Sequence, residues 1–238
     1  MADLSFKRIE KKYAISDSQK EILLKCFCEK LKLDKFCTDK GYYSLKNIYV
    51  DDDNNFLIRT SISKPTYKQK IRVRKYEGQK SNYLEIKKKC DGTVGKRRVE
   101  LTDSEIDDFF YKKIIPKKEK FLDQNVLDEI AGVVLTNNIR PYALLSYDRI
   151  SFKSKDNSDL RITLDFNIKC NETKDFVWEH SEKAIPLLKE GYCLLEIKNT
   201  QNYPLWLANL LSCNKIYPVS FSKIGTFYKL NIKEKTRQ

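Results

Sequence analysis

Alternation between charged and apolar residues is the feature of this sequence that most limits what the chain can fold into. In the segment YKQKIRVRKY, the cations Lys70, Arg72 and Arg74 alternate with Ile71 and Val73. Successive side chains of a strand point to opposite faces of its sheet, so this segment has one charged and one apolar face. The apolar face is expected to cover a core, and the charged face needs a partner of its own.

The same alternation recurs along the chain and predicts an antiparallel sheet of about eight strands. The alternating segments are residues 6–15, 68–76, 83–89, 146–152, 160–168 and 193–199, with weaker alternation in 46–51 and 56–62. The stretches 51–55 and 153–159 then read as hairpin loops. Apolar residues at helical spacing predict amphipathic helices that cover the sheet in residues 16–33, 102–115, 119–132 and 202–213.

The charged faces of these strands admit two architectures. In the first, an open sheet leaves its charged face in water. In the second, the strands form an α+β tunnel or barrel whose interior is polar and basic and whose apolar exterior is clad by helices. The faces carry ten cations against four carboxylates: Arg8, Lys12, Lys70, Arg72, Arg74, Lys87, Lys89, Arg149, Arg161 and Lys198 against Glu10, Glu85, Asp165 and Glu196. Because two like charges about 4 Å apart repel by roughly 4 kcal/mol at an effective dielectric near 20, this surplus favours a tunnel that binds a chain of phosphates.

The composition indicates an acidic partner and a reducing compartment. Lys and Arg number 46 against 33 Asp and Glu, a formal net charge of +13, which suits nucleic acid, nucleotide, polyphosphate or an anionic membrane surface. The seven cysteines form no disulfide or zinc pattern, and His180 is the only histidine. Neither a signal peptide nor a membrane-spanning segment is evident, so we expect one soluble, cytoplasmic domain over residues 1–238.

A set of motifs runs in order over almost the whole chain. The motifs are R-x-E-x-K-Y from Arg8 to Tyr13, K-x-R-x-R-x-Y from Lys70 to Tyr76, LEIKKK at 84–89, Y-x-R at Tyr147 and Arg149, RITLD at 161–165, LEIKN at 195–199, and SK at Ser222 and Lys223. Together they resemble the VTC domain, a polyphosphate polymerase of the CYTH, or triphosphate tunnel metalloenzyme, superfamily. The resemblance implies an antiparallel β tunnel lined with basic residues and acidic metal ligands. In it, manganese or magnesium assists transfer of the γ-phosphoryl group of ATP onto a polyphosphate chain, with release of ADP.

The resemblance also implies roles for individual residues. The phosphate-binding set is Lys70, Arg72, Arg74, Lys87, Lys96, Tyr147, Arg149, Arg161, Lys198 and Ser222, of which Lys70 and Lys198 are added from the charged faces. Lys12 and Lys223 are expected near the transferred phosphoryl group, where Arg72 and Arg74 also act. Glu196 is expected to hold the divalent metal. Glu10 and Glu85 are weaker metal candidates, since carboxylates in such strands more often pair with neighbouring cations.

One departure from the superfamily pattern favours a polymerase over a hydrolase. Triphosphatases and adenylyl cyclases of this superfamily typically begin with E-x-E-x-K, whereas Arg8 stands at the first carboxylate position here. A lost carboxylate weakens the case for a second metal that would activate water. A tunnel triphosphatase that hydrolyses inorganic or organic triphosphate stays open as the alternative.

A second alternative is a non-catalytic module that binds polyphosphate or RNA. RNA recognition predicts exposed aromatic residues between the cations, but those positions are mostly Ile, Val and Leu. We therefore expect ATP and polyphosphate as partners and no nucleic acid, with any membrane partner a separate protein. Asp165 reads either as a metal neighbour or as the ion-pair partner of Arg161. Lys88, Lys89, Arg97 and Arg98 lie in a charge-rich hairpin and are expected to be solvated surface.

Overall fold

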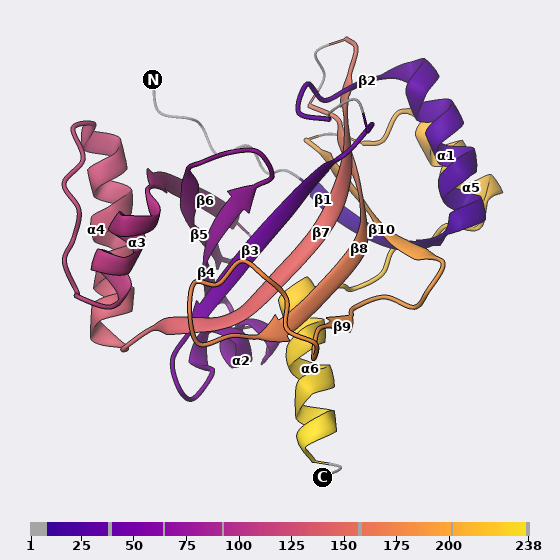
Figure 1. The fold of residues 1–238 in the computed structure, drawn as a ribbon. Helices are drawn as coiled ribbons and strands as arrows, with labels where there is room; N and C mark the ends of the chain where they lie inside the picture. Colours follow the sequence, from indigo (N-terminus) through magenta and orange to yellow (C-terminus); the bar gives the residue numbers. More distant parts are fainter. Residues whose placement is uncertain are drawn as a thin grey trace. The chain divides into compact units, whose positions relative to one another are not determined.

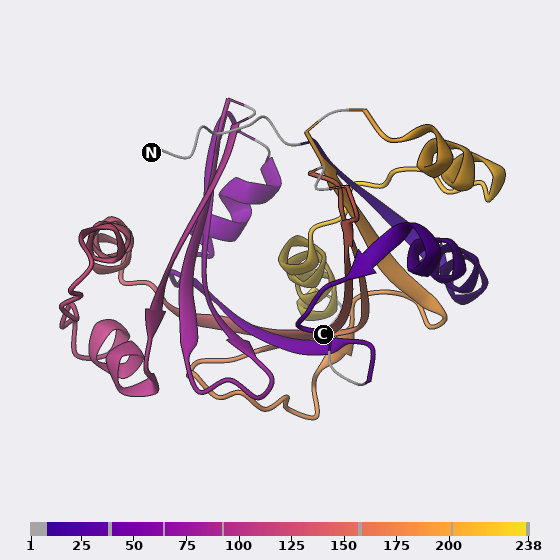
Figure 2. The same ribbon diagram turned by 90° about the horizontal axis from the view of Figure 1, so that it is seen from above.

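The structure, a computed structural model, describes residues 9–37, 40–63, 65–91, 93–156, 159–200 and 202–236. Figures 1 and 2 show the path of the chain. The chain divides into two compact units. Unit 1 comprises Met1–Ser44, Tyr147–Ile168 and Pro186–Ser222, and unit 2 comprises Leu45–Ser146, Lys169–Ile185 and Lys223–Gln238. The single domain expected over residues 1–238 stays a prediction. Arg8 lies outside the described residues.

Unit 1 contains a sheet in which the strands hydrogen-bond in the order β1-β10-β8-β7. Its strands are β1 (Ile9–Ser16), β10 (Tyr192–Asn199), the first part of β8 (Arg161–Glu172) and the second part of β7 (Arg140–Ser154). The short β2 (Leu31–Leu33) pairs with β7, and β9 (Ile185–Pro186), at the boundary between the units, pairs with β8. The pairs β1 with β10, β10 with β8 and β2 with β7 are antiparallel.

Two helices cover the apolar face of the strands of unit 1, as Figure 1 shows. They are α1 (Asp17–Lys30) and α5 (Leu205–Cys213). Helix α1 begins with a capping box between Ser16 and Gln19, which satisfies backbone N–H groups of its first turn. Strands and helices share one buried apolar cluster that includes Tyr13, Ile15, Ile162, Leu164, Leu195 and Ile197 together with Leu23, Phe27, Leu207 and Leu211.

In unit 2, the first part of β7 is followed by β3, β4, β5 and β6 in that hydrogen-bonding order. These strands are β3 (Tyr43–Asp51), β4 (Tyr67–Tyr76), β5 (Asn82–Cys90) and β6 (Thr93–Leu101). The pairs β3 with β4, β4 with β5 and β5 with β6 are antiparallel. The sheet predicted from the alternation is therefore present, and the chain has the predicted α+β class.

The helices of unit 2 are α2 (Phe56–Ser63), α3 (Asp103–Phe110), α4 (Phe121–Thr136) and α6 (Lys223–Lys235). Helices α3 and α4 pack on the apolar face of β4 to β6 (Figure 2). The shared cluster includes Ile71, Val73, Leu84, Ile86, Val99 and Leu101 from the strands and Ile106, Phe109, Leu127, Ile130 and Val134 from the helices. In α6, Ile224 and Phe227 are buried, and the Phe227 ring lies 6.2 Å from that of Tyr142.

Most predicted elements are confirmed, and two predictions are wrong. The four predicted helices correspond to α1, α3, α4 and α5, although α1 ends at Lys30 because the next three residues form β2. Residues 56–62, predicted as a weak strand, form α2 instead, so the stretch 51–55 leads into a helix and is no hairpin loop. Strand β6 and helix α6 were not among the predicted elements. None of the helices in the described part of the chain is long and apolar enough to cross a membrane.

Candidate functional site

Unit 2 carries a charged face on the side of its strands opposite the helix-covered cluster. Antiparallel register aligns Tyr49, Arg72, Glu85 and Arg98 across four strands, and Lys70, Lys87 and Lys96 across three. Residues in such cross-strand positions point to the same side of a sheet. We call this set the unit 2 face: Asn47, Tyr49, Lys68, Lys70, Arg72, Arg74, Tyr83, Glu85, Lys87, Lys89, Lys96, Arg98 and Glu100.

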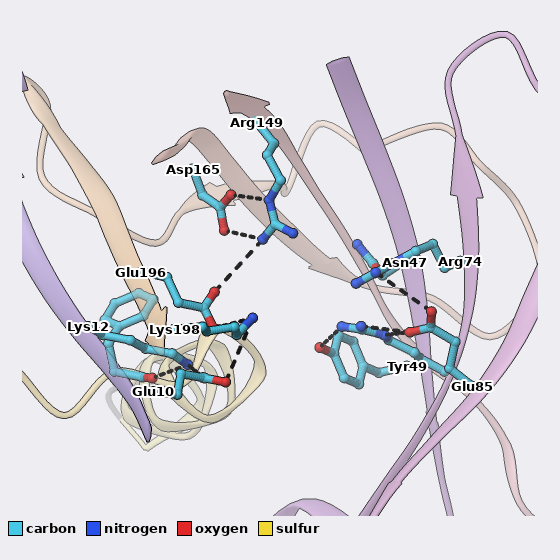
Figure 3. Close-up of polar contacts among 12 residues, drawn as sticks. Glu10, Lys12, Asn47, Tyr49, Arg74, Glu85, Arg149, Asp165, Glu196 and Lys198 are labelled. Atoms are coloured by element: carbon cyan, nitrogen blue, oxygen red, sulfur yellow. Dashed lines mark hydrogen bonds and ion pairs between the residues drawn. The ribbon is translucent and has the colours of Figure 1, made fainter. Parts of the chain in front are cut away.

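Glu85 is the carboxylate at the centre of the unit 2 face, and three cations contact it (Figure 3). Arg72 donates to its Oε2 through Nε at 2.8 Å and through Nη2 at 2.7 Å. On the other oxygen, Lys96 Nζ lies at 2.9 Å and Arg74 Nη1 at 3.7 Å. Glu85 is only 2% exposed, and burial by itself would raise its pKa. The positive charges of Arg72, Arg74 and Lys96 outweigh burial and hold that pKa well below its ordinary value.

Neutral side chains of β3 hold the two arginines in place. Tyr49 accepts a hydrogen bond at 2.9 Å from Arg72 Nη1, and Asn47 Oδ1 accepts one at 2.8 Å from Arg74 Nε. Asn47 is fully buried and donates through Nδ2 to the carbonyl oxygen of Leu145 at 3.3 Å. Sequence reasoning assigned no role to either residue. The signal was present in the weak alternation of residues 46–51, which places Asn47 and Tyr49 on one face of a strand.

The row of Lys70, Lys87 and Lys96 extends the positive charge of the unit 2 face. Desolvation, together with the charges of Arg74 and Arg72, lowers the pKa of Lys96 to about 8, although Glu85 opposes the change. The Lys96 side chain is 42% exposed, so solvent moderates these interactions. The charge of Lys96 is therefore lost at a lower pH than that of an ordinary lysine.

The other cations of the β5–β6 hairpin lie on opposite sides of the strands, some on the helix-covered side and some on the charged side. Lys88 and Arg97 both pair with Glu129 of α4, the Arg97 contact being 2.7 Å long, and lie away from the charged face. Arg98 is exposed, as expected, and register places it on the unit 2 face, with its guanidinium 4.6 Å from the centre of the Tyr83 ring. Arg98 is therefore an additional candidate for anion binding.

Unit 1 carries a second charged face, on the side of its strands opposite α1 and α5. Lys12 lies opposite Glu196 and Glu10 opposite Lys198 in the pairing of β1 with β10. Lys198 Nζ contacts Glu196 Oε1 at 3.0 Å and Glu10 Oε2 at 3.8 Å, so the two carboxylates share one ammonium group. We call this set the unit 1 face: Glu10, Lys12, Arg149, Arg161, Thr163, Asp165, Glu196 and Lys198.

Glu196 is buried within the unit 1 face. Burial raises its pKa, but the charges of Lys198, Lys12 and Arg149 and a hydrogen bond with Glu10 together hold the pKa well below its ordinary value. The nearest Arg149 atom lies 4.0 Å from Glu196 Oε2. Glu196 is consequently ionised over the physiological pH range and can act as an oxygen ligand.

Asp165 pairs with Arg149 on the neighbouring strand (Figure 3). Arg149 Nε and Nη2 donate to the two carboxylate oxygens of fully buried Asp165 at 2.6 and 2.8 Å. Asp165 thus pairs with Arg149 and not with Arg161, the partner that we considered from the sequence. Arg161 lies opposite Lys198 and is exposed. The buried Tyr147 ring lies 5.1 Å from the Arg149 guanidinium, so this arginine is fixed from two sides.

Lys12, Ser222 and Lys223 are the remaining predicted site residues. Lys12 lies on β1, and Ser222 and Lys223 lie at the start of α6. Lys12 Nζ donates at 3.1 Å to the carbonyl oxygen of Phe221, and the Val219 N–H donates at 2.7 Å to the carbonyl oxygen of Lys12. Ser222 is the last residue of unit 1, and Lys223 is the first residue of unit 2 and of α6. The segment that precedes Ser222 is therefore held against the strand that carries Lys12.

The oxygen atoms of the unit 1 face fit a divalent cation. Glu196 and Glu10 lie on neighbouring strands and contact the same ammonium group, and Thr163, directly opposite Glu196, has a buried hydroxyl oxygen without a hydrogen-bond partner among the described residues. The described residues contain no group of three or more His, Cys, Asp or Glu placed to hold a metal. Mg²⁺ is typically held by one or two carboxylates with phosphate oxygens and water as further ligands, and this donor set matches that mode. Glu85, surrounded by three cations, fits an ion-pair role instead.

The fold is shared with solved structures of two candidate adenylyl cyclases. A candidate adenylate cyclase from Bacillus halodurans is 14% identical, with a TM-score of 0.57 over 90% of this chain and 93% of that chain. A candidate adenylyl cyclase from Hippeastrum, described as having a dominant triphosphatase activity, is 15% identical, with a TM-score of 0.50 over 93% of this chain and 95% of that chain. These likenesses define the fold class of the protein.

Within that class, the family is given by the sequence. The profile of the VTC domain matches residues 7–230, nearly the whole chain, so the protein belongs to the VTC domain family. No curated protein matches the sequence. The resemblance inferred from the ordered motifs is thereby confirmed, and so is the fold class expected from it.

Proposed function

We propose that this protein is a polyphosphate polymerase that transfers the γ-phosphoryl group of ATP onto a growing inorganic polyphosphate chain and releases ADP. Membership of the VTC domain family supports the proposal. The observation that carries it is the unit 2 face, where Arg72, Arg74 and Lys96 share the single carboxylate of Glu85. Such a cluster has more positive than negative charge, which suits an anionic ligand.

The unit 2 face is suited to a chain of phosphates because its donors are numerous and held in place. Charge-assisted hydrogen bonds to phosphate contribute roughly 1.5–3 kcal/mol each. Arg72 and Arg74 are fixed by Tyr49, Asn47 and Glu85 before any ligand arrives, so little side-chain entropy is lost on binding. Lys70, Lys87 and Arg98 add charge along the same face, and a run of phosphates presents a negative group to each.

The transfer needs no side chain as a nucleophile. A terminal oxygen of the polyphosphate chain attacks the γ-phosphorus of ATP, the bond to the bridging oxygen of the β-phosphate breaks, and ADP leaves with that electron pair. The terminal phosphate is already largely deprotonated, so the protein has to align the reactants and neutralise charge on the transferred group. Fixed arginine and lysine side chains supply both effects.

The unit 1 face supplies the oxygen ligands in this proposal. Glu196, with Glu10 as its neighbour, would hold Mn²⁺ or Mg²⁺, which when bound neutralises charge on phosphate oxygens. Lys12 and Lys223 keep the role that the family resemblance implies, next to the transferred phosphoryl group. The phosphate-binding roles of the remaining residues stay proposals: Tyr147, Arg149, Arg161, Lys198 and Ser222.

A triphosphatase is the second candidate, because the Hippeastrum protein of the same fold is described as having that activity. It would use the same cationic face with water as the acceptor. Incubation of the purified protein with ATP and Mn²⁺ or Mg²⁺ separates the two candidates. We expect acid-stable chains longer than tripolyphosphate, together with ADP, on a polyacrylamide gel. Release of orthophosphate without any chain would contradict the polymerase and support the triphosphatase.

A further inference from the structure

The connection between α3 and α4 displays apolar side chains in solvent. Residues 111–122 read YKKIIPKKEKFL. Phe121 is 76% exposed, Leu122 75% and Ile114 54%, and Tyr111 and Ile115 are also exposed. Scattered exposed apolar residues need no explanation, but a contiguous group indicates an interaction surface. We call this segment the 111–122 connection.

The connection is ordered by contacts with its own unit, so its exposed side chains are held outward. Lys118 Nζ pairs with Glu105 of α3 at 2.6 Å, and the Lys118 N–H donates to Gln124 Oε1 of α4 at 2.8 Å. The Tyr111 hydroxyl lies 3.3 Å from Asp175 Oδ1. Figures 1 and 2 agree that the connection runs along the side of α3 and α4 that faces away from the strands of unit 2. That position leaves it open to a large partner.

Lysines surround the exposed apolar side chains. The connection contains Lys112, Lys113, Lys117, Lys118 and Lys120, with Glu119 as its single acidic residue. Lys112 and Lys118 are engaged by Asp108 and Glu105. For Lys113, Lys117 and Lys120, no ion pair is found within the described ranges, and all three are exposed. Cations and apolar side chains thus project together from one short segment.

We propose that the 111–122 connection docks the protein on a bilayer surface that contains anionic lipids. Apolar side chains flanked by lysines match a lipid interface, where the apolar groups enter the acyl boundary and the ammonium groups lie among anionic headgroups. A protein partner fits less well, because Lys is depleted and Arg enriched at protein–protein interfaces, and the connection has five Lys and no Arg. The attachment is peripheral, and it places the protein at a membrane surface independently of its activity.

Flotation with lipid vesicles tests the proposal. We expect the protein to float with vesicles of phosphatidylcholine and phosphatidylserine, to remain behind with phosphatidylcholine alone, and to bind more weakly as salt rises. The double substitution Phe121→Ser and Leu122→Ser should lower partitioning by about tenfold or more, from the loss of two apolar anchors. Replacing Lys117 and Lys120 with Ser should lower it by about fivefold for each lysine.

A matched control comes from α5 of unit 1. Leu205 is 75% exposed, as Leu122 is, but lies outside the lysine cluster, so Leu205→Ser should leave partitioning unchanged. The double substitution Arg72→Ala and Arg74→Ala tests whether the unit 2 face is responsible instead, and it should also leave vesicle binding intact. The Phe121 and Leu122 variant should keep the wild-type thermal shift with tripolyphosphate, which shows that it is folded.

Three results would overturn the proposal. The first is that both serine variants of the connection, the one at Phe121 and Leu122 and the one at Lys117 and Lys120, bind vesicles as strongly as the wild-type protein does. The second is that the Leu205→Ser control, or the double variant of Arg72 and Arg74, loses as much vesicle binding as the variants of the connection do. The third is a wild-type protein that ignores anionic vesicles but forms a dimer that the Phe121 and Leu122 substitutions dissociate, since a second copy of the chain would then be the occupant of this surface.

Discussion

The charged faces of the two units differ in how their cations are balanced. On the unit 2 face, Arg72, Arg74 and Lys96 share one carboxylate, Glu85. On the unit 1 face, three of the four cations contact three carboxylates: Lys12, Arg149 and Lys198 with Glu10, Asp165 and Glu196, while the fourth cation, Arg161, lies opposite Lys198. Figure 3 draws members of both sets.

This difference separates two kinds of ligand. A face with many more cations than carboxylates retains positive charge and attracts a polyanion. A face whose cations and carboxylates are nearly equal in number has carboxylate oxygens that can turn to a divalent cation when one is present. The two faces arise from the same strand alternation, so the placement of a few carboxylates decides which ligand each face takes. Substitutions that alter this balance should therefore have different effects in the two units.

The largest effect is expected from removing the cations of the unit 2 face. Arg72→Ala combined with Arg74→Ala removes two charge-assisted contacts to phosphate, worth roughly 1.5–3 kcal/mol each, so tripolyphosphate affinity should fall by at least about 100-fold. Thermal unfolding with and without tripolyphosphate measures the loss, since a ligand that binds only the folded state raises its stability. Arg97→Ala is the matched control, because Arg97 pairs with Glu129 on the other side of the sheet. An unchanged thermal shift in the double variant would refute the assignment.

The next effect concerns Glu85 itself. Glu85→Gln leaves the cations around it without their buried carboxylate, so the free energy of unfolding should fall by about 3 kcal/mol, and tripolyphosphate should recover part of it. The folded-state pKa of Glu85 lies below its ordinary value of 4.5. Its contribution to stability is therefore full above pH 4.5 and is lost as pH falls toward the folded-state pKa. Urea unfolding over this pH range should show that the variant lacks this component of the acid sensitivity.

Glu129→Gln provides the comparison for Glu85. Glu129 pairs with Lys88 and Arg97 away from the charged face. Its loss should leave the response to tripolyphosphate unchanged. If Glu85→Gln and Glu129→Gln respond alike to tripolyphosphate, the unit 2 face does not bind the anion as proposed.

On the unit 1 face, Glu196→Gln should separate metal dependence from anion binding. We expect metal-dependent turnover to fall by about 10- to 100-fold, with a higher metal concentration needed for half-maximal rate, because an oxygen ligand loses its charge. The thermal shift with tripolyphosphate should persist. Glu10→Gln should have the smaller effect of the two. Full turnover by Glu196→Gln at every metal concentration would show that Glu196 is not the ligand.

The smallest expected effect is a pH dependence from Lys96. Its pKa in the free protein is lowered to about 8. As pH rises through this value, Lys96 loses its charge and tripolyphosphate affinity should fall by about fivefold, a modest change because the side chain is partly exposed. Lys96→Arg keeps a charge over the whole range, so its affinity should stay flat between pH 7 and about pH 9. Isothermal titration at several pH values measures both proteins, and identical pH profiles would exclude Lys96 as the titrating group.

Helix α2 illustrates where the sequence misled. Residues 56–62 include Phe56, Ile58 and Thr60, which favour strands by propensity. The segment is helical because upstream carboxylates satisfy its first N–H groups: Asp51 accepts from the N–H groups of Leu57 and Ile58 at 2.8 Å each, and Asp52 accepts from that of Phe56 at 2.8 Å. Burial raises the pKa of Asp51 to about 6, despite these hydrogen bonds. Capping of this kind overrides propensity and is not visible in periodicity.

The candidate site was predicted more completely in strands with strong alternation than in the other strands. Alternation placed Arg72, Arg74 and Glu85 on one face, because side-chain direction along a strand is a local property. Asn47 and Tyr49 were missed because the alternation in their strand is weak. Arg98 was expected to be solvated and is exposed, but its position on the charged face was missed because the strand that carries it was not predicted. These errors come from uncertain strand boundaries, and they affect individual residues but not the character of the face.

The sequence by itself determined the charged and apolar faces, the surplus of cations and the family, since these depend on residue order alone. Only the tertiary structure decided which cation meets which carboxylate. Asp165 pairs with Arg149 and not with Arg161, and Lys96 reaches Glu85 from a diagonal position on the next strand. The physical reason is strand register, which depends on packing of the whole sheet and which a shift of one residue would change for every pair.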